Sequence, residues 1–277
     1  MSQILKYGGL ETKGLVKKSE PGMPLISIIT VVFNGEKYLE ETIKSVINQT
    51  YKNIQYIIVD GASKDSTIDI IEKYNDKIDY WLSERDSGIA DAFNKGLRFA
   101  KGELISFINS DDWYEPDAVQ TIVNHYSEKY HIYCGILNLF DKNNNFIKYR
   151  RSRIHLIKFG MYIMHPTLFV HKRIFEEVGG FDTSFKIAMD FDFILRVRKL
   201  TDYSFKNTDT VLANMRMIGV SSDLATVKEE ELIVKERYLK PLEFLISKNS
   251  NFVVQVLYYL KIIIKSIIQR KRIDKDF

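Results

Sequence analysis

The sequence is poor in cysteine and has no apolar stretch at its start. Cys134 is the single cysteine among 277 residues, which excludes an internal disulfide and a cysteine-rich zinc site. We expect Cys134 to be a small core residue, and the scarcity of cysteine fits a reducing cytoplasm. Residues 1–24 contain neither a sustained apolar run nor a small-residue cleavage site, so they predict a polar leader rather than a secretion signal.

The chain also lacks a strong charge of either sign. Its 40 basic and 36 acidic residues leave a net charge of +4, which is too weak a field to indicate a nucleic-acid partner. The hydrophobic content of 45% is ample for a core. The length then fits one large domain, or one domain with an appendage.

What the first half does contain is a regular alternation of apolar β-branched runs with segments of helical spacing. Parallel neighbouring strands need crossover connections, so this alternation predicts a doubly wound parallel sheet. The helix that follows the third strand is expected to end with a cap at Gly102. The predicted strands cover residues 25–33, 54–60, 78–83 and 102–108, and the predicted helices cover 35–50, 66–74 and 89–102.

The second half does not show this regular alternation of strand and helix patterns. Residues 131–151 alternate loosely around the polar stretch DKNNN, which predicts a β-hairpin. A helix-like segment follows at 171–180, and a further helix is expected to begin near Asp190 and Asp192. These two carboxylates could serve only to favour the positive N-terminus of that helix.

Polar residues follow the predicted strands where each strand ends. Asn34, Glu36 and Asp60 follow the first two strands, and Asp111 and Asp112 follow the fourth. Carboxyl ends of parallel strands meet at one edge of a sheet, where ligands bind in open α/β folds. Two adjacent carboxylates suit Mg²⁺ or Mn²⁺ bridging phosphates, although an aspartate-rich turn before a helix starting near residues 115–116 would look the same.

Eight segments together resemble the family-two inverting glycosyltransferases, which have a GT-A-type fold. The resemblance extends from about residue 24 to residue 222. It implies an α/β protein with a Rossmann-like, mostly parallel sheet flanked by helices. The segments are ISIITVVFNGEKYLEETIKSVINQTY, IVDGASKDST, SERDSGIADAFNKGLRFAKGE, FINSDDWYEPDA, HPTLFV, GGFDTSF, AMDFDFILR and IGVSS.

The same resemblance implies a division of the chain. Residues 25–222 would form the GT-A domain, with a nucleotide-binding half at about 25–116 and an acceptor half at about 117–222. Residues 223–277 would form a helical, amphipathic and basic C-terminal extension.

The resemblance also implies a nucleotide-sugar donor and a divalent ion, Mn²⁺ or Mg²⁺. Asp111 would be the metal ligand and Asp112 a supporting one, although Asn109 stands where the family often has a first aspartate. His165 would lie near the metal or the acceptor, unless it is a core histidine. Arg85 and Lys95 could add positive charge at the diphosphate, or could be solvated. The implied donor-binding residues are Phe33, Asn34, Glu36, Asp60, Asp91, Lys95, Ser110 and Asp111.

Inversion needs a base that takes the proton of the acceptor hydroxyl, and the resemblance gives this role to Asp190. A carboxylate desolvated in a cleft has a raised pKa, which suits a general base. Asp192 is expected instead to cap its helix or to pair with Arg196.

The C-terminal segment 252–268 is apolar but is interrupted by Gln255, Lys261 and Lys265, and it is short for a membrane span. Its helical spacing separates an apolar sector from a basic one. Residues 252–272 are therefore expected to lie on a membrane surface as an amphipathic helix, or to pack on the domain or on a partner subunit. A homo-oligomer is one form of the second alternative.

The sequence thus predicts a metal-dependent enzyme that moves a sugar from a nucleotide-diphosphate sugar, expected to be a UDP-sugar. Its acceptor would be a saccharide or a lipid-linked saccharide in bacterial surface-polysaccharide assembly, such as O-antigen or capsule. The expected location is the cytoplasm, with peripheral attachment to the inner face of the cytoplasmic membrane.

Two other functions fit the sequence less well. A nucleotidyltransferase would need a glycine-rich basic loop after the first strand, and VVFNGEKYL is not one. An inert binding module would not need Asp111, Asp112 and Asp190 together.

Overall fold

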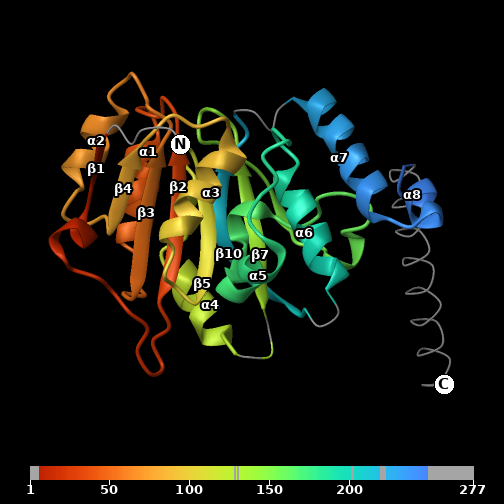
Figure 1. Ribbon diagram of the computed structural model, residues 1–277, viewed down its shortest axis with the longest axis horizontal. Coiled ribbons are helices and arrows are strands. Elements are labelled where there is room, and N and C mark those ends of the chain that lie inside the picture. Colours follow the sequence, from red (N-terminus) through yellow and green to blue (C-terminus); the bar gives the residue numbers. More distant parts are fainter. Residues whose placement is uncertain (1–5, 128, 130, 201–202, 219–222, 249–277) are drawn as a thin grey trace, which may run out of the picture.

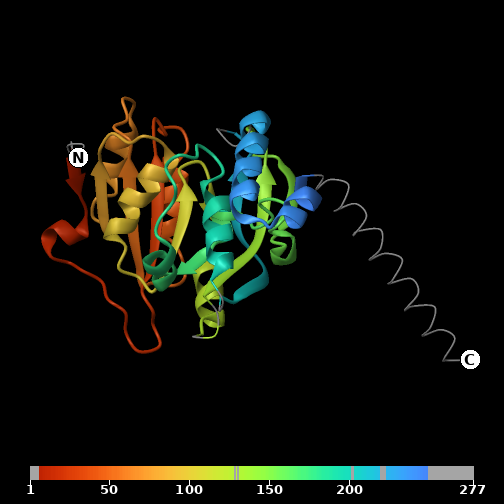
Figure 2. The same ribbon diagram turned by 45° about the vertical axis from the view of Figure 1, so that its right-hand side comes forward.

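The structure, a computed structural model, describes residues 6–127, 129, 131–200, 203–218 and 223–248 (Figure 1). Within these residues, ten strands form one sheet that is covered by helices on both faces (Figures 1 and 2). The strand order is β1-β4-β3-β2-β5-β9-β7-β10-β6, and β8 pairs with β7 beside this path.

The first half of the sheet is parallel, as the alternating pattern predicts. β2 lies between β3 and β5, and β4 lies on the far side of β3. Each residue of β2 and β3 is buried, which explains why both strands read as continuous apolar runs. These strands and the helices between them are β2 (Ile26–Val32), α1 (Leu39–Ile47), β3 (Ile54–Asp60), α2 (Thr67–Lys73), β4 (Tyr80–Ser83), α3 (Ile89–Phe99) and β5 (Leu104–Asn109).

The second half of the sheet is mixed, so the expected mostly parallel sheet holds only for part of it. β9 runs antiparallel to both of its neighbours, β5 and β7, so β7 is parallel to β5. On its other side, β7 pairs in parallel with β10. The predicted hairpin is confirmed by β7 and β8. The strands are β6 (Trp113–Tyr114), β7 (Ile132–Phe140), β8 (Phe146–Arg151), β9 (Phe169–His171) and β10 (Phe205–Arg216).

Two apolar layers hold the helices on the sheet. One layer joins α1, α2 and α4 (Ala118–His125) to one face. The other joins α3, α5 (Lys172–Val178) and α6 (Met189–Lys199) to the opposite face, and it includes the buried Cys134. Short 3₁₀ turns complete the connections at η1 (Leu10–Lys13), η2 (Ile154–Leu156) and η3 (His165–Thr167).

The structure adds one strand and corrects one expected cap. The polar leader, residues 1–24, includes β1 (Lys6–Gly8), a short antiparallel edge strand on β4, whose three residues are too few to give a sequence pattern. Gly102 does not cap α3, because that helix ends at Phe99 and Ala100 is extended. A Cβ atom at Gly102 would lie 2.5 Å from the backbone nitrogen of Ser27, so glycine is needed there for close packing on β2.

The start of the C-terminal extension forms α7 (Leu224–Tyr238) and α8 (Pro241–Lys248). α7 packs along α6 (Figures 1 and 2). Among the described helices, none has the length and apolar character needed to span a bilayer. The segment 252–272, predicted to lie on a membrane or on a partner, falls outside the described residues.

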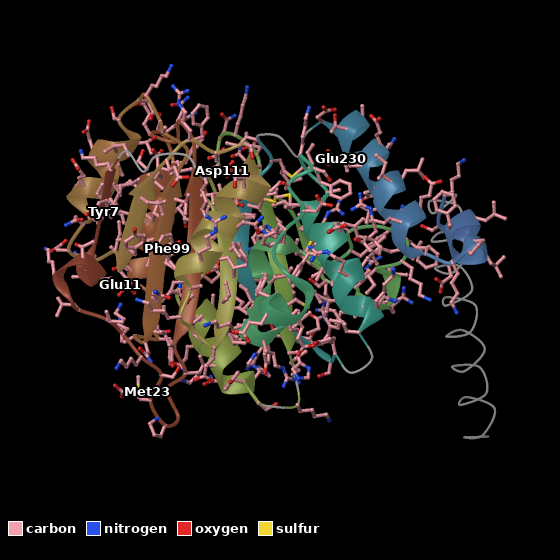
Figure 3. All side chains as sticks on the ribbon, in the orientation of Figure 1. Tyr7, Glu11, Met23, Phe99, Asp111 and Glu230 are labelled. Atoms are coloured by element: carbon pink, nitrogen blue, oxygen red, sulfur yellow. The ribbon has the colours of Figure 1, made fainter. Side chains whose placement is uncertain are left out.

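The parallel strands end at one edge of the sheet. Figure 3 shows Asp111, just after β5, at this edge, while Met23, just before β2, lies at the opposite side. Glu230 of α7 lies on the same side as Asp111 (Figure 3). The carboxyl edge of the sheet and the adjoining end of α7 therefore frame the candidate site.

Candidate active site

The loops after β2 and β3 are joined by reciprocal hydrogen bonds. The backbone N–H of Lys64 donates to Oδ1 of Asn34 at 2.9 Å, and that of Ser66 donates to Oε2 of Glu36 at 3.0 Å. In return, the N–H of Asn34 donates to Oγ of Ser63 at 2.7 Å. Asn34 and Glu36 thus hold the two loops in register through Oδ1 and Oε2, respectively.

Asp60 ends β3 and is fully buried. Its carboxylate accepts hydrogen bonds from the Ser63 N–H at 3.0 Å and from the Ser83 hydroxyl at 2.7 Å. These bonds fix the turn after β3 and join it to the end of β4. Asp60 therefore lies at the predicted edge with much of its acceptor capacity already used by the protein.

Asp86 is a candidate site residue to which the sequence alone gave no role. A Cβ atom at Gly61 would lie 2.5 Å from Oδ2 of Asp86 and 3.3 Å from the Phe33 ring, so these three residues adjoin. Phe33 is 63% exposed, which leaves its ring free to stack on a base. Burial raises the pKa of Asp86, opposed by the Gly88 N–H that it accepts. The sequence feature that could have singled out Asp86 is its place in the segment SERDSG, shortly before the matched Asp91.

Lys95 is engaged by the protein. Its ammonium group donates to the backbone oxygen of Arg85 at 2.5 Å and lies 3.0 Å from Glu84 and 3.5 Å from Asp91. The side chain is buried, so Lys95 holds the loop between β4 and α3 and does not extend toward a diphosphate. Asp91 also accepts the N–H of Ser87 at 3.0 Å, at the start of α3.

The motif after β5 lies against the loop after β2. The Thr42 hydroxyl of α1 donates to the backbone oxygens of Ser110 at 2.9 Å and of Asp112 at 2.6 Å. A Cβ atom at Gly35 would lie 3.3 Å from Oγ of Ser110. Segments that are about 70 residues apart in the chain are thereby held together at the carboxyl edge.

Asp111 and Asp112 form a desolvated pair of carboxylates. Burial raises the pKa of Asp111, opposed by its own backbone N–H and by Arg216. Burial, and then the negative charge of Asp111, raise the pKa of Asp112 well above its usual range. Oδ1 of Asp112 accepts the Arg216 N–H at 3.2 Å, whereas its buried Oδ2 has no partner among the described residues.

This pair fits a divalent cation. A cation would relieve the repulsion between the two carboxylates and would satisfy the orphaned oxygen of Asp112. The residues that the structure describes contain no group of three or more histidine, cysteine or acidic side chains able to hold a metal. Asp111 and Asp112 would thus share the ion with water and a substrate phosphate, as Mg²⁺ sites commonly do.

His165 lies in the turn η3, against aromatic side chains of the core. Its ring packs in the core, with ring-centre distances of 5.4 Å to Phe93 and 6.5 Å to Phe107. Burial lowers its pKa to about 4, so the imidazole is neutral at pH 7. The core alternative weighed from the sequence therefore describes His165 better.

Asp190 lies in the first turn of α6 and is half-buried. Its Oδ1 accepts the N–H of Phe191 at 2.7 Å. Burial raises its pKa to about 7, with a further contribution from the charge of Glu231 and opposition from the Phe191 N–H. A carboxylate with this pKa would suit a general base that works near neutral pH.

Glu230 of α7 fixes the backbone just before Asp190. Its two carboxylate oxygens accept the N–H groups of Lys186, Ile187 and Ala188 at 2.8, 2.8 and 2.9 Å. These N–H groups precede α6, where they would otherwise lack partners. A buried carboxylate from another helix thus caps α6, and no local pattern in the sequence could reveal it.

Asp192, two residues after Asp190, has a structural role. It is fully buried and accepts from Nε of Arg196 at 2.8 Å and from the Tyr238 hydroxyl at 2.8 Å. Arg237 of α7 lies 3.4 Å away. The predicted pairing of Asp192 with Arg196 is confirmed.

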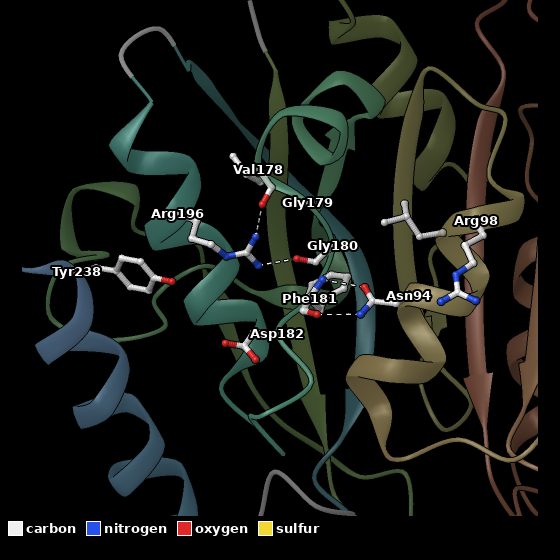
Figure 4. Close-up of a pocket in the computed structure, with 10 residues that line it drawn as sticks. Asn94, Arg98, Val178, Gly179, Gly180, Phe181, Asp182, Arg196 and Tyr238 are labelled. Carbon is white, nitrogen blue, oxygen red and sulfur yellow. Dashed lines mark hydrogen bonds between the residues drawn. The ribbon is translucent and has the colours of Figure 1, made fainter. Parts of the chain in front are cut away.

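A pocket of about 590 Å³ lies between α3 and α6 (Figure 4). Several of its polar groups pair within the protein: Arg196 donates to the backbone oxygens of Val178 and Gly180, both at 2.6 Å. Asn94 exchanges two hydrogen bonds of 2.8 Å with the backbone of Phe181 (Figure 4). The pocket is therefore walled by groups that hold α3 and α6 together.

Arg216, at the end of β10, is buried beside the carboxylate pair. Its guanidinium carbon lies 4.4 Å from the ring centres of both Tyr38 and Trp113. It donates to Glu41 and to the backbone oxygen of Asp111, both at 2.5 Å, and to Asn144 at 2.9 Å. The Arg216 side chain is 0% exposed, so its charge is balanced entirely by these neighbours.

The family model described as glycosyl transferase family 2 matches residues 27–194, which is more than half of the chain. The chain belongs to glycosyl transferase family 2. This confirms the family suggested by the motifs, and it makes the protein a glycosyltransferase rather than a nucleotidyltransferase.

Relatives of similar sequence bear the same name. An uncharacterized glycosyltransferase of Rickettsia typhi is 31% identical over 232 residues, which are 79% of this chain and 73% of the relative. The Chondroitin synthase of Escherichia coli is 25% identical over 79% of this chain, but the aligned part is only 32% of that enzyme. A glycosyltransferase of Rickettsia bellii is likewise longer, with 32% of its length covered.

Solved structures share the fold. Staphylococcus aureus TarS 1–349 in complex with UDP-GlcNAc has a TM-score of 0.62 at 18% identity, covering 83% of this chain and 73% of that one. The mannosyltransferase PcManGT of Pyrobaculum calidifontis, in complex with GDP-Man and Mn²⁺, also has a TM-score of 0.62 at 18% identity. The aligned part is 82% of this chain and 69% of PcManGT. Both likenesses confirm the expected GT-A architecture.

The cap on α6 predicts a selective effect on stability. Glu230→Ala is expected to lower the free energy of unfolding by about 2–3 kcal/mol, because three backbone N–H groups, of which that of Ala188 is buried, lose a charged acceptor. Glu229→Ala, at an exposed neighbouring position on α7, should change it by less than about 0.5 kcal/mol. Urea unfolding of both variants measures the difference, and equal midpoints would show that the cap contributes nothing.

The burial of Arg216 gives a second prediction. Arg216→Met should cost about 3–5 kcal/mol of unfolding free energy, because it leaves acidic neighbours without their cation. Arg151→Met is the matched control: Arg151 pairs with Asp209 on the surface, where such a pair contributes about 1 kcal/mol or less. Chemical denaturation would contradict the role of Arg216 if the two variants lost similar stability.

Proposed function

We propose that the protein transfers a sugar from a nucleoside-diphosphate sugar to a saccharide hydroxyl with inversion at the anomeric carbon. The acceptor oxygen attacks from the face opposite the departing nucleotide, and Asp190 takes the proton of the hydroxyl. The observation that carries this proposal is the environment of Asp190, whose pKa of about 7 suits a general base. Asp190 follows the backbone that Glu230 holds through the Ala188 N–H, and Glu230 lies on the same side of the molecule as Asp111 (Figure 3).

The donor is proposed to be a UDP-sugar, bound at the carboxyl edge of β2, β3 and β5. Support comes from the exposed Phe33 ring, which suits base stacking, and from Asp86 beside it as a hydrogen-bond acceptor. The TarS neighbour is complexed with UDP-GlcNAc, whereas PcManGT is complexed with GDP-Man. The UDP assignment follows the TarS complex.

Asp111 and Asp112 are proposed to hold Mn²⁺ or Mg²⁺ together with the donor diphosphate. When bound, such an ion neutralises the charge that develops on the leaving nucleotide. The PcManGT structure contains Mn²⁺ at a comparable level of fold similarity. The chain's own contribution is the loop geometry, in which Thr42 and Arg216 hold the backbone of Ser110, Asp111 and Asp112.

The biological setting stays a prediction from the sequence. A lipid-linked acceptor, a role in surface-polysaccharide assembly and peripheral attachment through residues 252–272 belong to it, as does a homo-oligomer. Each depends on residues or partners outside the described structure.

Loss of the carboxylate of Asp111 should abolish metal-dependent nucleotide binding. Asp111→Asn removes one of the two charges that would hold the ion. Calorimetric titration with UDP should show affinity enhanced by Mn²⁺ for the native protein and not for the variant. Asp76→Asn, at an exposed aspartate after α2, is the control and should keep the enhancement. An unchanged Mn²⁺ effect in Asp111→Asn would contradict the assignment.

Asp190→Asn should bind the donor normally but turn over at least about 100-fold more slowly, the scale of a lost general base. The amide cannot accept the acceptor's proton, whereas the donor-binding loops are untouched. Steady-state kinetics of the native protein and of Asp190→Asn test this: kcat should fall, whereas the KM for the donor should stay the same. Near-normal kcat would require a different base.

The negative charge of Glu231 should contribute to the pH dependence of kcat. Asp190 must be deprotonated to act, so kcat is expected to rise with pH through a value near 7. Glu231→Gln removes a negative charge that raises the pKa of Asp190, so the rise should move to lower pH. The pH–rate profiles of the two proteins measure this shift. An unchanged or upward shift would contradict the coupling.

A further inference from the structure

Three aromatic rings adjoin one another between the carboxylate pair and the hairpin of β7 and β8. Trp113 directly follows Asp112, and its ring centre lies 5.0 Å from that of Phe140, at the end of β7. The Phe140 ring lies in turn 5.8 Å from that of Phe146, at the start of β8. We call Trp113, Phe140 and Phe146 the aromatic row. The row thus begins at the proposed metal motif and extends to the hairpin.

The aromatic row becomes more exposed along its length. The side chains of Trp113 and Phe140 are half-buried, whereas Phe146 is 56% exposed. Met217 is exposed as well, and its backbone N–H donates to the oxygen of Phe140 at 2.8 Å. Tyr149, farther along β8, is a further exposed ring. Exposed apolar side chains that adjoin one another mark an interaction site, whereas scattered single ones need no explanation.

Arg216 holds the hairpin against the carboxylate pair. Its Nε donates to Oδ1 of Asn144 in the hairpin turn at 2.9 Å, and another of its guanidinium nitrogens donates to the backbone oxygen of Asp111 at 2.5 Å. Asp141 accepts two backbone N–H groups of the same turn, at 2.8 and 2.9 Å, which fixes the shape of the turn. The aromatic row is therefore preorganised relative to the metal motif, so a ligand would not have to order it.

We infer that the aromatic row binds the acceptor as a saccharide chain of several pyranose rings. This rests on the proposed function and commits the acceptor to an oligosaccharide whose reactive end lies near the metal motif. The C–H face of a pyranose is apolar and stacks on an aromatic ring, and three rings offer more stacking surface than one sugar can cover. The hydroxyls at the pyranose edge can exchange hydrogen bonds with the exposed amides of Asn143 and Asn145 in the hairpin turn.

The composition of the hairpin disfavours two other occupants. Among the described strands, β8 pairs with β7 alone, so a second copy of the chain could add to its free edge. However, Lys148, Arg150 and Arg151 lie on this short strand, and like charges on an edge oppose such pairing. A bilayer would have to accept the polar turn at residues 141–145, which lies between Phe140 and Phe146 in the chain. A saccharide meets neither cost.

The test measures a chain-length preference with the full-length protein. Cellobiose is compared with cellohexaose, and chitobiose with chitohexaose, in titrations followed by tryptophan fluorescence. The emission reports on Trp113 because Trp81, the other of the chain's two tryptophans, is buried. We expect at least one hexasaccharide to bind at least about fivefold more tightly than its disaccharide, the scale of one added aromatic contact.

Substitutions at the exposed end of the row assign the preference to it. Phe146→Ser should remove the preference, whereas Phe146→Tyr, which keeps a ring at this position, should retain it. Tyr7→Ser is the matched control, because Tyr7 is an exposed aromatic residue on the edge strand β1, far from the hairpin in the strand order (Figure 3). The control should bind the saccharides as the native protein does.

Equal or undetectable binding of the long and short saccharides would overturn the inference, as would an equal loss in Tyr7→Ser. Binding to anionic phospholipid vesicles that Phe146→Ser abolishes, without a chain-length preference, would overturn it in favour of a lipid surface. Self-association that Phe146→Ser abolishes, again without the preference, would overturn it in favour of a second copy. Mn²⁺-dependent UDP binding by Phe146→Ser shows separately whether the proposed function stands.

Discussion

The buried guanidinium of Arg216 is the interaction on which the carboxyl edge of the sheet depends. It lies between the rings of Tyr38 and Trp113 and contacts Glu41, Asn144 and the motif after β5. A charge taken out of water is costly unless it is fully paired, so these groups can adopt only an arrangement that surrounds it. One side chain of the second half thereby sets the geometry of the proposed donor site in the first.

Two aspartates on one turn of α6, Asp190 and Asp192, have different properties because their surroundings differ. Asp192 is surrounded by Arg196, Arg237 and the Tyr238 hydroxyl, which use its acceptor capacity. Asp190 receives one backbone N–H and faces the negative charge of Glu231, so its pKa rises to about 7. Helix α7 supplies partners to one and repulsion to the other, and it caps the backbone before both through Glu230.

The sequence was most informative where local pattern determines structure. Continuous apolar runs predicted β2, β3 and β5, and the acidic residues after them predicted the edge at which Asp60 and Asp111 lie. Partners distant in sequence could not be predicted: Glu41 lies 175 residues before Arg216, and Glu230 caps a backbone more than 40 residues earlier. Such contacts follow from packing, as do the burial of His165 and the pairing of Lys95, to which the family resemblance gave ligand roles.

The loops after β2 and β3 hold each other through Asn34, Glu36 and the backbone of residues 63–66. Asn34 adopts a φ of 51°, a left-handed conformation that asparagine tolerates better than most residues. Neither loop can therefore change length or shape alone without freeing polar groups of the other. In evolutionary terms, the two loops are expected to change together rather than one at a time.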